Sequence, residues 1–279
     1  LPRLAAGETI GCYCLTEPQA GSDAANQKTT AVRQGDCYVL NGTKAWVTNG
    51  TVADTAIVYA VTDPSKGSKG ISAFIVEADF PGWKIAREEK KMGINATATA
   101  EIALVDCLVP KENLLGEEGV GFRIALRTLD DGRVGIAAQA TGIAQGALDE
   151  AARYAQERTA FGQLIANFQA IRFMLADMAT EIEAARLLTR RAAWLQDQAG
   201  PVDGNREAGR YTMEASIAKL FASEMAQRAC HKAVQIHGGY GYSREYPVER
   251  MYRDQRITEL YEGTSEIQRL VIARHLLGG

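Results

Sequence analysis

A single carboxylate near the C-terminus is the strongest candidate for chemistry in this chain. Glu262 lies in the segment Tyr-Glu-Gly-Thr at 261–264, between an amphipathic run before it and an apolar run after it. Because burial disfavours the charged form of a carboxyl group, the pKa of Glu262 would rise towards the range of a useful base. The alternative is a structural role for this segment at a helix N-terminus, with Thr264 or Ser265 as the cap.

Two segments in the first fifth of the chain have side chains suited to a flat, polar ligand. Residues 12–23 read as a strand that runs into a Gly/Ser turn, which could present backbone N–H groups and hydroxyls. In 41–50, the alternation of side chains along a strand places Trp46 and Thr48 on one face. A broad ring beside a hydroxyl suits a flat heterocycle, although Trp46 could equally be a core residue.

Two segments in the second half could bind phosphate groups. Arg158 and Phe161 together could bind a phosphate and cover an adenine, with Gln169 further along the chain. The run Gln-Ile-His-Gly-Gly-Tyr-Gly-Tyr at 235–242 closes a helix with glycines, whose N–H groups could approach a pyrophosphate. A glycine terminator is also common without a ligand. The run is not a GxGxxG fingerprint after a strand, so we do not expect a Rossmann site.

The composition is that of an ordinary globular chain. It has 279 residues, 46% hydrophobic and 23% charged, with a net charge of −3, which gives no reason to expect nucleic acid or an anionic membrane as partner. No apolar run approaches the ~20 residues of a membrane span. The five scattered cysteines indicate reduced thiols, and Cys12-x-Cys14 indicates strand packing, so we expect no metal site. Because the chain begins Leu1-Pro2, without an initiator Met or signal peptide, we expect a fragment or processed product.

The elements that must position these residues fall into two halves. From residue 10 to about 109, short β-branched and aromatic runs recur at 35–40, 56–61, 71–76 and 100–105, with no helical stretch between them. Turn pairs separate them at Asn41-Gly42, Asn49-Gly50, Asp63-Pro64 and Pro81-Gly82. We predict a compact β-barrel or sandwich domain over residues 1–113.

After Pro110 the period becomes helical. Residues 121–158 carry apolar residues at helical spacing, and the next helix has one stripe of Ile171, Met174, Met178, Ile182, Ala185, Leu188, Ala192 and Leu195. This spacing is typical of a core, so we assign the methionines to packing. A Gly/Pro-rich break at 200–205 precedes two more helices, at about 210–238 and 264–277. We predict an antiparallel four-helix bundle over 114–279, and hence an α+β multidomain chain.

Six stretches in this order resemble the acyl-CoA dehydrogenase family along essentially the whole chain, and its short-chain (butyryl-CoA) branch in particular. Each stretch alone is a weak signal, but six in order are specific. They are Leu15-Thr16-Glu17-Pro18 with Gly21-Ser22-Asp23, the segment 41–49, Leu129-Asp130-Asp131-Gly132-Arg133, Arg158 with Phe161-Gly162, Gln235-Ile236-His237-Gly238-Gly239, and Tyr261-Glu262-Gly263-Thr264. The resemblance implies the family's β-barrel domain and helical bundle, without the helical domain of about a hundred residues with which the family normally begins.

The resemblance also implies an FAD site that involves both domains. Trp46 would flank the flavin ring and Thr48 would hydrogen-bond near N5, while the 158–169 and 235–239 segments would hold the pyrophosphate and adenosine, typically of a neighbouring subunit's FAD. The full set of implied cofactor contacts is Leu15, Thr16, Gly21, Ser22, Trp46, Val47, Thr48, Arg158, Phe161, Gln169, Gln235, Ile236, Gly238, Gly239, Thr264 and Glu266. The implied substrate contacts are Ser22, Asp130, Arg133, Tyr261 and Gly263.

The implied activity is the α,β-dehydrogenation of a short-chain acyl-CoA to a trans-2-enoyl-CoA. Glu262 matches the family's base, which would take the α-proton while flavin N5 accepts the β-hydride. Some branches carry the base directly before the Arg of the Asp-x-x-Arg motif, but that position here is Gly132, which cannot act. Asp131 would point about 100° away from it on a helix. The assignment to Glu262 is therefore internally consistent.

Other members of the same fold family provide the alternatives. An acyl-CoA oxidase, or a nitroalkane- or monooxygenase-type member, often replaces the base by Asp or loses it, whereas Glu262 is intact. A second alternative is a non-catalytic assembly subunit. For the dehydrogenase, the resemblance implies electron-transfer flavoprotein as acceptor and a homotetramer built as a dimer of dimers. The expected compartment is the cytoplasm of a bacterium, which we favour, or the mitochondrial matrix of a eukaryote.

Overall fold

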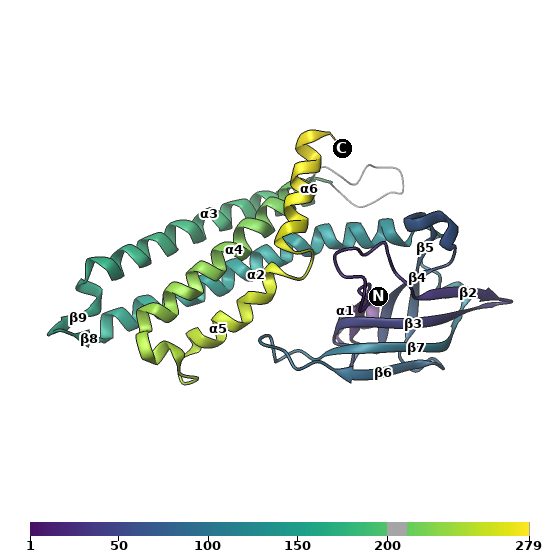
Figure 1. Cartoon of the computed structure of the whole chain (residues 1–279), viewed down its shortest axis with the longest axis horizontal. Coiled ribbons are helices and arrows are strands. Elements are labelled where there is room, and N and C mark those ends of the chain that lie inside the picture. The colour runs from purple at the N-terminus through teal and green to yellow at the C-terminus, as the bar shows by residue number, and fades with distance from the viewer. Residues whose placement is uncertain (200–210, 279) are drawn as a thin grey trace. The chain divides into compact units, whose positions relative to one another are not determined.

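The computed structural model describes residues 1–199 and 211–278 and divides into two compact units, Leu1–Arg127 and Thr128–Gly279 (Figure 1). The predicted boundary after residue 113 follows the change from strands to helices. The boundary between the two compact units instead falls after Arg127, within helix α2 (Gly121–Glu157). The start of α2 belongs to the first unit because its backbone packs closely on the sheet. A Cβ at Gly121 would lie 2.4 Å from the carbonyl carbon of Ser72.

The first unit is a curled sheet of seven strands. Two of its pairings are parallel, β1 with β4 and β2 with β4, and the others are antiparallel. The strands follow the order β1-β4-β2-β3-β7-β6, with β5 added on β4, so the described pairings close no ring and the predicted barrel is a half-barrel. The strands are β1 (Gly11–Cys14), β2 (Thr30–Gln34), β3 (Cys37–Thr48), β4 (Thr55–Val61), β5 (Ile71–Glu77), β6 (Trp83–Glu88) and β7 (Thr99–Pro110). Three short helices accompany them, α1 (Pro2–Ala5), η1 (Pro64–Gly70) and η2 (Lys111–Asn113).

Strand β3 corrects one prediction. The Asn41-Gly42 pair is not a turn, because β3 runs without a break from Cys37 to Thr48 and pairs with β7 on both sides of it. The register shifts between Leu40 and Gly42. A Cβ at Gly42 would lie 2.6 Å from the Cα of Thr29, so the glycine allows a close approach of two backbones.

A buried ion pair ties the segment after β1 to β3. The Lys44 ammonium lies 2.8 Å from the Glu17 carboxylate and also donates to the carbonyl of Leu15, at 3.1 Å. The carboxylate accepts the N–H groups of Lys28 and Thr29 as well, at 2.6 and 3.0 Å. Burial alone would raise the pKa of Glu17, but Lys44 and these donors lower it to about 2.

The ion pair leads to a pH-dependent stability. We expect Glu17→Gln to lower the free energy of unfolding at pH 7 by about 1.5–3 kcal/mol, because charge-assisted hydrogen bonds are lost. Because the pKa of Glu17 falls from 4.5 to about 2 on folding, this advantage is complete above pH 4.5 and is lost as the pH falls towards 2. Urea unfolding of both proteins between pH 7 and pH 3 measures it. Glu8→Gln, at an exposed carboxylate, is the control.

The second unit is helical. The four predicted long helices correspond to α2, α3 (Gln169–Ala199), α4 (Thr212–His237) and α6 (Ser265–Leu277), and α5 (Pro247–Gln255) was not predicted. Figure 1 shows α2, α3 and α4 running alongside one another. The predicted break at 200–205 lies outside the described residues. The short elements are β8 (Thr159–Ala160), β9 (Gln163–Leu164), η3 (Ile165–Asn167), η4 (Gly238–Tyr242) and η5 (Arg256–Glu259).

Small side chains let these helices pack closely. A stripe of alanines on α2 is fully buried at helical spacing: Ala137, Ala140, Ala144, Ala147, Ala151 and Ala155. Met178 and Ile182 of α3 lie in the same core, and Met174 packs against it. The interpretation of the α3 methionines as packing residues is therefore confirmed.

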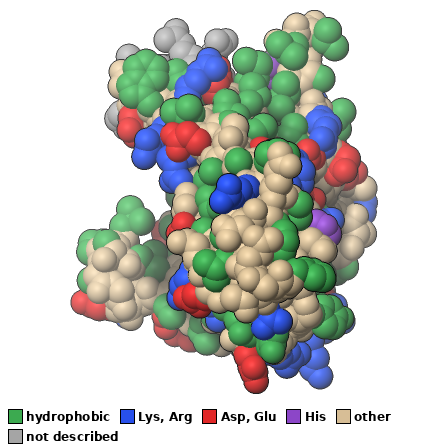
Figure 2. Space-filling model, turned by 90° about the vertical axis from the view of Figure 1, so that its left-hand side faces the viewer, with side chains coloured by type: hydrophobic (Ala, Val, Ile, Leu, Met, Phe, Trp, Pro, Cys, Tyr) green, Lys and Arg blue, Asp and Glu red, His purple; other side chains and the backbone are tan. Residues whose placement is uncertain are grey.

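The surface of the helical unit has no single dominant charge on the face in Figure 2. Seen from the β8–β9 end, Lys and Arg side chains are interspersed with Asp, Glu and apolar ones, in keeping with a net charge of −3. In residues 1–199 and 211–278, the helices are all too short or too polar to cross a bilayer.

Candidate functional site

Glu262 lies in a left-handed turn between η5 and α6. Its φ is 54° and that of Gly263 is 88°, a region that L-residues other than glycine rarely adopt. A Cβ at Gly263 would lie 2.7 Å from the side-chain nitrogen of Gln268, and the positive φ would strain any other residue there, so glycine is favoured at this position. Thr264 is the N-cap of α6 and accepts the N–H of Ile267 at 3.4 Å, which confirms the structural role considered for Thr264. The cap fixes where α6 begins and therefore where the turn lies.

The carboxylate of Glu262 is buried against a gap in α2. One of its oxygens, Oε2, is inaccessible and has no hydrogen-bond partner within the described part of the chain. The gap is made by Gly132, where a Cβ would lie 2.5 Å from this oxygen. Burial raises the pKa of Glu262, while the charges of Arg133 and Lys219 oppose the rise. The carboxyl group thus combines a raised pKa with an oxygen that has no hydrogen-bond partner among the described residues.

The two acidic residues of the Asp130–Arg133 motif have hydrogen-bond partners other than Glu262 and the turn that carries it. Arg133 donates to Asp130 at 2.6 Å, and the second oxygen of Asp130 accepts the Thr212 hydroxyl at 2.7 Å. Both side chains of the pair are buried, so the structure shows them as an internal pair, and their contact with a substrate stays a prediction. Asp131 accepts hydrogen bonds from Gln196 and Tyr211, on α3 and directly before α4, in agreement with the expectation that it points away.

Two residues that the sequence analysis missed, Lys219 and Gln268, hold the turn, and a third contact comes from Tyr261, which the resemblance implies as a substrate contact. Lys219 of α4 donates to the carbonyl of Gly263 at 2.7 Å. Gln268 of α6 donates to the same carbonyl at 2.9 Å and to that of Glu262 at 3.0 Å. Tyr261 donates its hydroxyl to Gln139 of α2, and burial raises the pKa of Tyr261 to about 12. A lysine or glutamine in a helix normally reads as a surface residue, so the sequence carried no signal for them.

The residues implied to face the flavin gather along β3 and the segment after β1. The N–H of Ala45 donates to the Thr16 carbonyl at 2.9 Å, which places that segment beside Trp46. Trp46 is 61% exposed, which excludes the alternative of a core residue, and Thr48 is exposed on the same strand. Leu15 and Val47 are buried, and their implied cofactor contacts stay predictions. Gly21 and Ser22 are exposed in the following turn.

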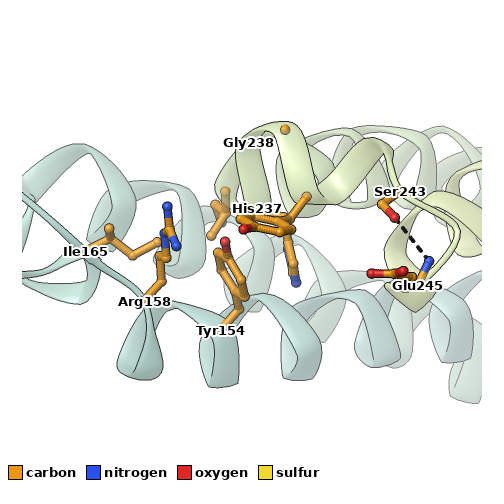
Figure 3. Close-up of a pocket in the computed structure, with 10 residues that line it drawn as sticks. Tyr154, Arg158, Ile165, His237, Gly238, Ser243 and Glu245 are labelled. Carbon is orange, nitrogen blue, oxygen red and sulfur yellow. Dashed lines mark hydrogen bonds between the residues drawn. The ribbon is translucent and has the colours of Figure 1, made fainter.

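The phosphate-binding candidates meet at a pocket of about 610 Å³ in the helical unit (Figure 3). Arg158 at the end of α2 lies over the Tyr240 ring, 5.3 Å from its centroid, and Gly238 and Gly239 line the same pocket. A Cβ at either glycine would meet nothing within 4 Å, so open space lies beside both backbones. The N–H of Gly238 already donates to the Gln235 carbonyl and is therefore not bare.

Of the remaining candidates, only one lies at this pocket. Ile236 lines the pocket, whereas Phe161, Gln169 and Gln235 do not and are exposed; Phe161 is 96% exposed. Glu266 is exposed in the first turn of α6. Exposed side chains of this kind are what a site completed by a second subunit would use. The cofactor contacts implied for these four residues stay predictions.

Backbone strain coincides with several candidates. Six non-glycine residues of the described chain have positive φ: Trp46, Asn49, Ile94, Asp106, Phe161 and Glu262. Three of them, Trp46, Phe161 and Glu262, were singled out from the sequence for chemistry. Such conformations cost of order 1–3 kcal/mol each and concentrate at functional sites, which supports these three assignments.

Comparison with known proteins covers both units. The family model of the acyl-CoA dehydrogenase middle domain matches residues 12–107, and that of the acyl-CoA dehydrogenase C-terminal domain matches residues 119–277. The short-chain specific acyl-CoA dehydrogenase of Mus musculus mitochondria is 55% identical over 271 residues, covering 97% of this chain and 64% of the mouse protein. This chain thus spans just under two thirds of that relative.

Two further relatives extend the match. The caffeyl-CoA reductase-Etf complex subunit CarC of Acetobacterium woodii is 54% identical over 265 residues, covering 95% of this chain and 68% of that protein. The structure of butyryl-CoA dehydrogenase from Megasphaera elsdenii superimposes with a TM-score of 0.94 at 49% identity, covering 99% of this chain and 70% of that one. With both family models matched in order and this degree of identity, the chain belongs to the acyl-CoA dehydrogenase family.

Proposed function

We propose that the protein is an FAD-dependent dehydrogenase that converts a short-chain acyl-CoA into a trans-2-enoyl-CoA. The observation that carries this proposal is the Glu262 carboxylate, which is buried against Gly132 and has one oxygen without a hydrogen-bond partner in residues 1–199 and 211–278. A carboxylate with a raised pKa and an unused oxygen is suited to remove a weakly acidic proton. Members of this family use FAD, and the similarity to short-chain dehydrogenases favours a short acyl group.

The roles of the chain's own groups follow from the turn. Glu262 would take the proton from the α-carbon of the thioester. The N–H of the same residue would donate to the thioester carbonyl as enolate charge develops, and such preorganised donors are worth roughly 3–4 kcal/mol. FAD, when bound, supplies the acceptor for the hydride that leaves the β-carbon. Lys219 and Arg133 contribute the positive charges that offset the burial of the carboxylate.

The pocket at the end of α2 fits the phosphate and adenosine portion of FAD. It combines the Arg158 guanidinium, the Tyr154 and Tyr240 rings, and two glycines whose backbones adjoin open space. Its volume lies within the range of ligand pockets, roughly 300–1,000 Å³. The Glu245 carboxylate also lines the pocket and would disfavour an anion, so Arg158 is the group on which phosphate binding depends.

Arg158 therefore gives a direct test of cofactor binding. We expect Arg158→Ala to weaken FAD binding by about tenfold or more, because a charge-assisted contact worth about 1.5–3 kcal/mol is lost. Titration of the FAD-free protein, followed by flavin fluorescence, measures the change. Arg153→Ala is the matched control, since Arg153 lies on the last turns of α2, shortly before Arg158, but pairs with Glu150 outside the pocket. Equal affinities for both variants would contradict this placement of FAD.

The activity itself is tested with the purified protein loaded with FAD. Butyryl-CoA with electron-transfer flavoprotein as acceptor should yield trans-2-butenoyl-CoA. Oxygen consumption with the same substrate and no added acceptor would favour the oxidase alternative instead. A protein that takes up no FAD and turns over no acyl-CoA would overturn the proposal and favour a non-catalytic assembly subunit.

The proposed partners rest on the relatives. CarC is by its name a subunit of a complex with Etf, which supports electron-transfer flavoprotein as the electron acceptor of this protein. We propose a homotetramer, because exposed Phe161 and Gln169 are implied to reach a neighbouring subunit's FAD; a mass measurement of the native protein tests it. The proposed compartment is the cytoplasm of a bacterium, as the relatives include bacterial as well as mitochondrial enzymes.

A further inference from the structure

Lys219 is a fully buried lysine inside the alanine-rich helix α4. Its side chain has no exposed surface, and its ammonium donates to the Gly263 carbonyl at 2.7 Å. Burying an ammonium is costly unless it is paired and hydrogen-bonded, and lysine is among the residues least often fully buried. The free-energy cost of burying this ammonium suggests a functional role for it. The nearest unusual feature is the turn at Glu262, with its positive φ.

The turn is held from two helices at once. Gln268, also fully buried, donates from its side-chain amide nitrogen to the carbonyls of both Glu262 and Gly263. The Gly263 carbonyl thus has two side-chain donors, one from α4 and one from α6. A non-glycine residue keeps a left-handed backbone conformation only where the surrounding structure holds it. These three hydrogen bonds hold the backbone of Glu262 and Gly263 in that conformation.

The charged groups that face Lys219 and Glu262 come from α2, α4, η5 and the turn itself. Lys219 faces Arg133 of α2, Glu224 of its own helix, Glu259 of η5 and Glu262 of the turn. Burial, with Arg133 adding to it, lowers the pKa of Lys219 to about 8, so the lysine is mostly protonated at neutral pH. Glu262 faces two cations, Arg133 and Lys219. Arg133 is committed to Asp130, which leaves Lys219 without an ion-pair partner of its own among the described residues.

We propose that Lys219 and Gln268 are positioning residues for the base: together they fix the backbone of the Glu262–Gly263 turn, and Lys219 alone also supplies the positive charge that stabilises the ionised Glu262 carboxylate. The two residues therefore separate two effects. Gln268 contributes geometry without charge, and Lys219 contributes both. The inference rests on the proposed function insofar as Glu262 is the base of the reaction.

The experiment compares Lys219→Met with Gln268→Leu in the full chain loaded with FAD. The Glu262 carboxyl is titrated by NMR in protein labelled with ¹³C at the glutamate δ-carbon, and its signal is identified by its loss in Glu262→Gln. We expect Lys219→Met to move the titration of Glu262 to higher pH and to lower kcat about 10- to 100-fold with butyryl-CoA. Gln268→Leu should lower kcat in the same range and leave the titration in place.

Lys232→Met is the matched control, since Lys232 lies on the same helix and pairs with Asp177 and Glu181 at the surface. It should change neither readout. Lys219→Met should fold, because Gln268 still satisfies the Gly263 carbonyl; Lys219→Gln, which removes the charge but keeps a donor, should give the same titration shift with a smaller loss of kcat.

The outcomes are distinguishable. If Glu262 titrates at the wild-type pH in Lys219→Met, the inference is overturned, whatever the activity. If Gln268→Leu keeps the wild-type kcat, the positioning role of Gln268 is wrong. If the wild-type protein itself turns over no acyl-CoA, the proposed function fails, while the titration still decides whether Lys219 stabilises the carboxylate.

Discussion

Replacing Glu262 by glutamine is expected to lower turnover of butyryl-CoA by about 10²–10⁴-fold, the range of a general base. Glutamine has the same shape, so it fits against Gly132, and it keeps the backbone N–H of the turn. It cannot accept the α-proton. Because FAD is proposed to bind through other groups, the variant should retain the cofactor with unchanged absorbance. Steady-state kinetics and flavin spectra of the purified protein measure both.

The control for this substitution is Glu259→Gln. Burial raises the pKa of Glu259 as well, and Glu259 lies three residues before Glu262, paired with Arg256 at 2.8 Å. Its loss should leave turnover close to that of the wild type. If Glu262→Gln still dehydrogenates acyl-CoA at the wild-type rate, another residue is the base, and the assignment from geometry and family alike is wrong.

The helices could be predicted from the sequence because their apolar stripes are long. Met178 and Ile182 repeat at helical spacing in a stripe that runs over seven turns, and the same holds for the alanines of α2. The short helix α5 was missed because its nine residues are mostly charged or polar and bury only Val248 and Gln255. Strand β6 was missed because all but its first residue are exposed, so it has no alternation to detect.

The candidate site was predictable only in part. The sequence identified Glu262 by its motif and recognised that Gly132 cannot act as a base. It could not show that the missing side chain of Gly132 is the space that the carboxylate occupies, because 130 positions separate the two residues. The role of Lys219 could not be predicted for the same reason, because its hydrogen-bond partner is a backbone carbonyl 44 residues further along the chain. Contacts of this kind depend on tertiary packing, which local patterns do not encode.

The gap at Gly132 gives the second large effect. We expect Gly132→Ala to lower turnover about 100-fold, because the new methyl group would lie 2.5 Å from Oε2 and 2.7 Å from Cδ of Glu262. The carboxylate is the flexible end of a side chain and can rotate away, so the backbone need not move. The cost therefore falls on the position of the base rather than on folding, and kcat with butyryl-CoA should fall while the thermal midpoint changes little.

Gly135→Ala is the matched control for this substitution, because a Cβ there meets nothing within 4 Å and the helix is the same. Both substitutions gain about 1 kcal/mol of helix propensity, but only the one at 132 meets Glu262. The double variant Gly132→Ala, Glu262→Gln makes the test sharper. Once the base is absent, moving the side chain at 262 has no further effect on proton removal, so the two losses of turnover should not add. Additive losses would mean that Gly132 affects turnover by a route other than the carboxylate of Glu262.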